Sequence, residues 1–222
     1  YLAIYVVCVA VVGCSPERAV AGEDPDDAPG TPVTSARAEP KGASNPEVDR
    51  SRYEWLNALD VSDTSISPLS QRFPPPDGYE RVDVREDGFG AFLRGLPAYT
   101  DRSTVHAFDG RVIDAPSAAV IALDTGERDL QQCADTAIRL HAEFLWSSGQ
   151  RDAIGYHFTS GDRSTWRDWS NGERFRIRGS HVERVRTGAP SRSRRAFRDY
   201  LDHLFIYAGT RSLRHDSATV EV

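Results

Sequence analysis

The chain has no methionine and only one lysine, Lys41, so arginine supplies nearly all of its positive charge. This bias is typical of GC-rich coding, and abundant arginine alone therefore does not indicate nucleic-acid binding. The formal net charge of −6 is ordinary for a soluble protein. With 39% hydrophobic residues, the folded part is expected to bury one modest core.

The sequence also lacks the short motifs of several enzyme classes. It contains no Gly-x-Ser-x-Gly nucleophile elbow, no phosphate-binding glycine loop and no Cys-x-x-Cys pair. Its histidines show no recognised metal-ligand spacing. They are His106, His141, His157, His181, His203 and His215. No metal site and no cofactor is therefore predicted.

Long hydrophobic runs are absent except for Leu2–Val12, which is too short to cross a membrane core as a helix of about 20 residues. Its length is typical of the apolar region of a signal peptide. The run closes with Val11-Val12-Gly13-Cys14, which resembles the bacterial lipobox, where the cysteine is lipid-modified and becomes the mature N-terminus. We expect residues 1–13 to be a signal peptide that lacks its own start, and Cys14 to be the lipidation site. A core strand that ends in Gly-Cys is the alternative.

Few cysteines remain once this segment is set aside. Cys8 lies in the removable signal and Cys14 carries the lipid, so Cys133 is the only thiol expected in the mature domain. An intramolecular disulfide is then excluded, although the predicted compartment is oxidising.

Residues 14–48 are rich in proline, alanine, glycine, serine and acids, without apolar periodicity. Such a segment buries too little surface to offset its ordering entropy, and it is predicted to be a disordered tether. Residues 49–222 are predicted to form a single α+β domain, because helical and strand patterns mix without regular alternation.

The apolar periodicity predicts the elements of this domain. Helices are expected over 51–60, 129–146 and 193–208, and a turn or short helix over 88–97. Strands are expected over 79–84, 104–108, 117–123 and 153–158. Asp129 is predicted to cap the second helix, and Gly209 to end the third.

Several stretches resemble the uncharacterised bacterial domain-of-unknown-function family 4846. They are PPPDGYERV (74–82), FGAFLRGLP (89–97), VHAFDGR (105–111), RDLQQCADTAIRLHAEFLW (128–146), FTSGDR (158–163) and FRDYLDHLFIYAGTRSL (197–213). The resemblance implies no established reaction. Similar proteins continue with a Gly-Asp-Val-Phe-like turn and a strand carrying Pro-Gly-His, so the chain is expected to lack a C-terminal strand segment.

Cys133 is the candidate nucleophile, because it is expected near the start of a helix whose positive pole favours a thiolate. Gln131 and Gln132 could offer amide donors to an oxyanion. In the longer relatives, a cysteine on a helix followed by a histidine on a later strand is similar to papain-like thiol hydrolases such as cell-wall amidases. Within this chain His157 is the best local base. Alternatively, Cys133 fills the apolar face of its helix.

Three further groups of residues are each open to two interpretations. His106 and Asp109 are either a ligand pair or part of a turn. Thirteen arginines against five acids between Arg163 and Arg214, interleaved with aromatics, are either a face for an anionic envelope polymer or an ordinary solvated surface. Asp124 with its acidic neighbours could bind a cation, or form the acidic start of a helix.

The sequence therefore predicts a membrane-anchored, extracytoplasmic lipoprotein of the bacterial cell envelope, with an activity that it does not identify. A thiol hydrolase or amidase that uses Cys133, assisted by Gln132, is one alternative. A non-catalytic binder of an anionic envelope polymer is the other. The expected partners are the membrane, through the lipid, and cell-wall material, while nucleic acid is not expected.

Overall fold

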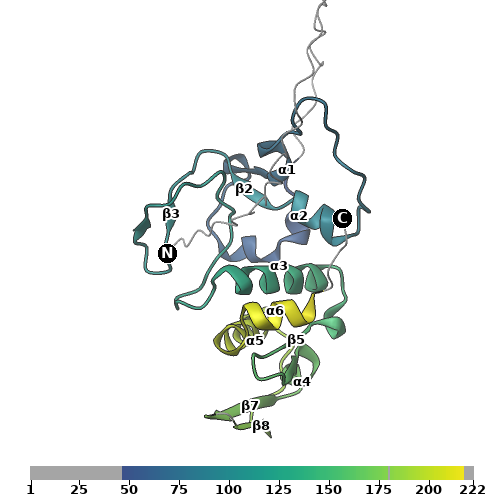
Figure 1. Ribbon diagram of the computed structural model, residues 1–222, viewed down its shortest axis with the longest axis vertical. Helices are drawn as coiled ribbons and strands as arrows, with labels where there is room; N and C mark the ends of the chain where they lie inside the picture. Colours follow the sequence, from purple (N-terminus) through teal and green to yellow (C-terminus); the bar gives the residue numbers. More distant parts are fainter. Residues whose placement is uncertain (1–46, 180, 218–222) are drawn as a thin grey trace, which may run out of the picture. The chain divides into compact units, whose positions relative to one another are not determined.

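The computed structural model describes residues 47–179 and 181–217 (Figure 1). Cys8, Cys14 and nearly all of the predicted tether lie outside the described residues. The predicted α+β class is confirmed, since several helices are combined with small antiparallel two-stranded sheets. In the described part of the chain, no helix has the length and apolar character needed to cross a membrane.

The helical elements comprise 3₁₀ helices (η) and α-helices. They are η1 (Arg50–Arg52), η2 (Glu54–Ala58), η3 (Asp63–Ser65), α1 (Leu69–Arg72), α2 (Phe89–Arg94), α3 (Cys133–Ser147), η4 (Arg151–Ala153), α4 (Trp166–Ser170), α5 (Arg194–Tyr207) and α6 (Thr210–Asp216). The strands pair as β1 (Ile66–Pro68) with β2 (Pro97–Tyr99), β3 (Val105–His106) with β4 (Val112–Ile113), β5 (Gly155–His157) with β6 (Arg163–Thr165), and β7 (Glu173–Arg178) with β8 (His181–Arg186).

The first hydrophobic cluster forms around aromatic residues of the N-terminal half. Tyr53, Trp55 and Phe92 are buried and their rings are in mutual contact. Trp55 Nε1 donates a hydrogen bond to the Ala122 carbonyl at 2.7 Å, and Tyr53 Oη donates to the Phe92 carbonyl at 2.8 Å. Both polar tips are therefore satisfied inside the core, as buried Tyr and Trp require. These contacts fix α2 and residues 120–123 against the N-terminal helices.

The second cluster is built on α5, whose apolar face follows the helical period that the sequence predicts. Ser193 caps this helix by accepting a hydrogen bond from the Ala196 N–H at 3.2 Å. Phe197 is fully buried and stacks on Trp146 of α3, with ring centroids 4.3 Å apart. The predicted helix over 193–208 is confirmed, and Gly209 separates it from α6.

Helix α3 contributes to both clusters and packs between α2 and α6 (Figure 1). It begins at Cys133, so the prediction that it starts at Asp129 is wrong. Gln132 is the N-cap, because the Asp135 carboxylate accepts a hydrogen bond from its backbone N–H at 3.1 Å. Cys133 is therefore the first residue of the helix rather than a residue one turn inside it.

Other predicted elements were also wrong. Residues 79–84 form no strand, since nothing pairs with them, and Tyr79 and Val82 are 73% and 75% exposed. Residues 117–123 are mostly buried but form only an isolated bridge, Ala98 with Ile121. The N-terminal helix is divided into η1 and η2. Over 117–123 and in the N-terminal helix, the apolar pattern identified buried residues more reliably than hydrogen-bonded partners, whereas over 79–84 it identified neither.

A buried ion cluster joins α3, α5 and the loop that precedes α3. The guanidinium of Arg139, 1% exposed, contacts the Asp124 carboxylate at 2.6 Å and Glu143 at 3.3 Å. From α5, Arg198 binds Asp124 at 2.7 Å and Arg194 binds Glu143 at 2.5 Å. Burial opposes ionisation of Asp124, but the surrounding arginines outweigh it and hold its pKa below the usual value. The interpretation of Asp124 as the acidic start of a helix is replaced by this structural role.

His203 of α5 lies among aromatic rings. Its ring centroid is 5.0 Å from that of Trp169 and 5.2 Å from that of Tyr207, and its Nε2 has no hydrogen-bond partner. Burial, followed by the positive charge of Arg174, lowers the pKa of His203 to about 4. The imidazole is therefore neutral in the folded protein at neutral pH.

Replacing Arg139 with Met is expected to lower the free energy of unfolding by about 3 kcal/mol, because it leaves buried carboxylates short of a partner. Urea unfolding followed by tryptophan fluorescence measures this loss. Arg167→Met is the matched control, since the Arg167–Asp152 pair is 62% and 72% exposed and such pairs contribute less than about 1 kcal/mol. Equal losses in the two variants would contradict a structural role for the buried cluster.

His203 is expected to make the fold sensitive to acid. Its pKa is lower in the folded state than the unfolded value of 6.5. The unfolded chain therefore binds more protons between these values, and stability is lost as the pH falls from 6.5 towards 4. After allowance for the partial exposure of His203, the free energy of unfolding is expected to fall by about 1–2 kcal/mol. His203→Phe should remove this part of the pH dependence in urea unfolding at pH 7 and pH 4.5. An unchanged slope would show that His203 does not cause it.

Candidate functional site

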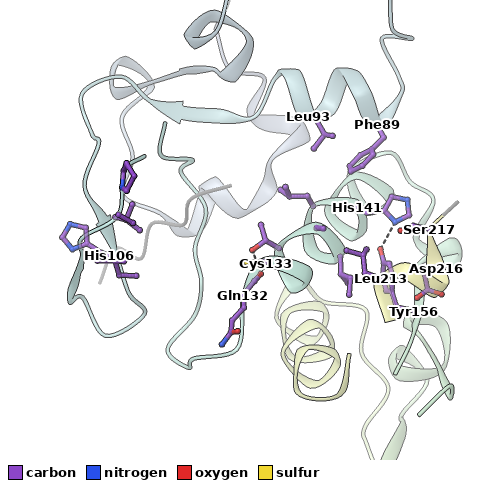
Figure 2. A pocket seen from close by; sticks show the side chains of 18 residues that line it. Phe89, Leu93, His106, Gln132, Cys133, His141, Tyr156, Leu213, Asp216 and Ser217 are labelled. Carbon is purple, nitrogen blue, oxygen red and sulfur yellow. Dashed lines mark hydrogen bonds between the residues drawn. The ribbon is translucent and has the colours of Figure 1, made fainter. Parts of the chain in front are cut away.

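A pocket of about 930 Å³ lies along α3 and is closed by elements from both halves of the domain. Phe89 and Leu93 of α2 give it an apolar wall (Figure 2). Ile113 of β4 also lines it. Leu213 of α6 and Tyr156 of β5 lie on another side. A concave, mainly apolar cavity of this size with a few polar groups has the character of a small-molecule site.

Cys133 lies in the wall of this pocket and is exposed. Its thiol has no hydrogen-bond partner among the described residues. Because it is the first residue of α3, it lies at the positive pole of the helix, where an anion is favoured. Cys133 shares the pocket-lining face of α3 with Ala137 and Leu140, of which only Leu140 is buried, and the alternative that Cys133 fills an apolar helix face stays a prediction.

The two glutamines before Cys133 have different environments. Gln132 is exposed and lines the pocket beside Cys133 (Figure 2). Gln131 is fully buried, and its Oε1 accepts a hydrogen bond from Arg139 at 2.8 Å. Of the two predicted oxyanion donors, only Gln132 is therefore among the residues that line the cavity.

His157, the predicted local base, is not among the residues that line the pocket. Its backbone N–H donates to Asp216 Oδ2 at 2.8 Å, and its ring Nδ1 is hydrogen-bonded to Asp216 Oδ1. Burial favours a raised pKa for Asp216, but these hydrogen bonds, with one from His215, outweigh it and lower the pKa. The structure thus gives His157 an acidic partner and no contact with Cys133, and its role as a base stays a prediction.

A histidine–tyrosine pair supplies polar groups to the pocket that the sequence did not reveal. His141 Nδ1 and Tyr156 Oη are 2.9 Å apart (Figure 2). Burial lowers the pKa of His141 and raises that of Tyr156, so both side chains are neutral at pH 7. His141 lies eight residues after Cys133, about 12 Å along the helix, which is too far for a hydrogen bond. In the sequence, His141 is linked to Cys133 only because both lie on the same predicted helix. No sequence pattern marks Tyr156 as a pocket residue.

His106 lines the opposite side of the pocket from His141 (Figure 2). Its Nδ1 is 3.1 Å from the Gly110 carbonyl, and Asp109 accepts a hydrogen bond from the Arg111 N–H at 3.1 Å. Gly110 has a positive φ of 83°, which a tight turn requires. The interpretation of this pair as part of a turn accounts for both side chains.

Many arginines of the C-terminal third are already paired within the molecule. Arg184 contacts Asp168 at 3.3 Å, and Arg176 contacts Glu183 at 3.7 Å. Arg174 stacks over Trp169, with 3.7 Å from its guanidinium carbon to the ring centroid. The positive charge available to an anionic polymer is therefore smaller than the sequence count suggests.

A comparison with protein families shows that the model of one family, described as a domain of unknown function (4846), matches residues 69–222. The family resemblance seen in the sequence is confirmed over this range. No curated protein and no solved structure matches the chain.

Proposed function

The chain belongs to the family described as domain of unknown function 4846, and we propose that it is a lipid-anchored protein of the bacterial cell envelope with a thiol reaction centred on Cys133. The observation that carries the reaction is the exposed Cys133 thiol at the first residue of α3, in the wall of the pocket. The lipobox-like segment that ends at Cys14 supports the location outside the cytoplasm.

The reaction class that best suits this arrangement is amide hydrolysis. The Cys133 sulfur attacks the carbonyl carbon of an amide, and the developing oxyanion accepts a hydrogen bond from Gln132. The carbon–nitrogen bond then breaks, and the proton of the thiol leaves with the amine. Water attacks the resulting thioester, which releases a carboxylic acid and restores the thiol.

The pocket also indicates the character of the substrate. Its walls are mainly apolar, and the neutral His141–Tyr156 pair can exchange hydrogen bonds with an uncharged polar group. An acyl or peptide amide flanked by apolar groups fits these surroundings. We propose an envelope peptide or acyl amide as the substrate, and the membrane, through lipidated Cys14, as a partner.

The thiol of Cys133 is expected to react faster in the folded protein than in the unfolded chain at pH 7. Iodoacetamide alkylation measured against pH, with Cys133→Ser subtracted to remove the other cysteines, gives its rate. We expect an increase of up to about fivefold, because the N-terminus of a helix stabilises a negative charge by up to about 1 kcal/mol.

Gln132→Ala is the companion variant, since it removes the proposed oxyanion donor and leaves the thiol exposed. Its alkylation rate should stay near that of the unmodified protein, whereas hydrolysis of a model amide should fall about a hundredfold. If the folded protein protects Cys133 from alkylation, the proposed nucleophile is excluded.

Lipidation at Cys14 is tested separately in the native bacterium. The protein should label with radioactive palmitate and partition with membranes, while Cys14→Ser should be unlabelled and recovered in the soluble extract. Cys133→Ser is the control, and it should label like the unmodified protein. An unlabelled protein, or equal labelling of the Cys14→Ser variant, would refute the lipid anchor without affecting the proposed reaction.

A further inference from the structure

Two histidines and one aspartate converge where the end of β5 meets the last turn of α6. They are His157, His215 and Asp216, and their nitrogen and oxygen ligand atoms all lie within 4.8 Å of one another. The two imidazole ring centroids are 4.2 Å apart. We propose that these three residues bind a divalent transition-metal ion of the zinc class.

The carboxylate of Asp216 is held in a fixed orientation by the backbone. Its Oδ2 accepts the His157 N–H at 2.8 Å, which leaves Oδ1 directed at both imidazoles. A hydrogen bond to the second carboxylate oxygen is how proteins orient a ligating carboxylate. The side chains of Asp216 and His157 are only 16% and 22% exposed, so the pair is partly shielded from water.

One of the three separations is already close to that which a metal needs, and the ligand atoms as a group lie within 4.8 Å of one another. Zinc binds nitrogen and carboxylate oxygen at about 2.0–2.2 Å, so neighbouring ligand atoms in a tetrahedral site lie about 3.4 Å apart. His215 Nδ1 is already 3.3 Å from Asp216 Oδ1. The His157 ring is hydrogen-bonded to the same oxygen, and it would have to draw back slightly as the metal replaces the shared proton.

His215 distinguishes a metal site from a purely structural ion pair. The pair of His157 and Asp216 is enough to join β5 to α6, and that role does not require a second imidazole. Yet the His215 ring, 64% exposed, has Asp216 Oδ1 as its only hydrogen-bond partner among the described residues. Asp216 also ends α6, where the negative pole of the helix disfavours a carboxylate unless a positive charge is near.

The donor set defines the class of metal. Two imidazoles and one carboxylate suit zinc and similar divalent transition metals, whereas Mg²⁺ and Ca²⁺ prefer oxygen ligands alone. Three protein ligands leave a coordination position for water or another molecule, as in catalytic rather than structural zinc sites. Asp216 also lines the pocket, so the site lies at its edge (Figure 2).

Isothermal titration of the full chain with ZnCl₂ tests this site. The unmodified protein should bind zinc at the cluster with a dissociation constant of about 10 µM or tighter. His215→Ala should weaken that binding at least about tenfold, because it removes one ligand. Asp216→Asn should do the same and keep an oxygen that can accept the His157 N–H, so the fold is expected to persist.

His181→Ala is the matched control, because this exposed histidine of β8 lies outside the cluster. All variants keep the same cysteines, so zinc bound by thiols is a constant background. Addition of zinc should also raise the melting temperature of the unmodified protein but not that of His215→Ala. Equal zinc binding by all variants, or none by the unmodified protein at about 100 µM, would overturn the proposed site.

Discussion

Arg139 is a residue of α3 whose charged side chain is buried. The position of the candidate site depends on the acids that neutralise this charge. Removing a guanidinium from water is costly unless its partners are close and well oriented. Asp124 comes from the loop before α3, and Glu143 lies one turn further along the helix. Because Arg194 and Arg198 of α5 bind the same two acids, the loop and both helices are fixed together.

This cluster determines what the start of α3 presents to the pocket. Gln131 is drawn inward by its hydrogen bond to Arg139, and the chain then turns into the helix at Gln132. Cys133, which follows, is left exposed in the pocket wall. A buried electrostatic network thus places the exposed Cys133 side chain at the positive pole of a helix, while apolar residues form much of the remaining wall.

The sequence predicted most reliably what is encoded locally. Helix α5 was predicted from its apolar period and from Gly209, and the structure adds the Ser193 cap. The start of α3 was missed because Asp135, inside the helix, forms the cap contact instead of Asp129. The strand expected over 79–84 was wrong because an alternating apolar pattern cannot show whether a partner strand exists.

The same distinction between local sequence patterns and contacts made by distant segments holds for the sites. Cys133 and Gln132 could be proposed from the sequence because they are adjacent and lie near the start of the helix expected over 129–146. The pairing of His141 with Tyr156 depends on how β5 packs against α3, and no spacing in the sequence encodes it. His157 and Asp216 are 59 positions apart, and only the packing of α6 against β5 brings them together.

Trapping of an acyl intermediate tests most directly whether Cys133 carries the reaction. The folded protein would be incubated with an activated ester of an N-acyl amino acid, digested at low pH and examined by mass spectrometry. A thioester on the peptide that contains Cys133, released by hydroxylamine and absent from Cys133→Ser, is the predicted result. Acylation confined to other residues, or none while the protein is folded, would contradict a thiol-centred reaction in this pocket.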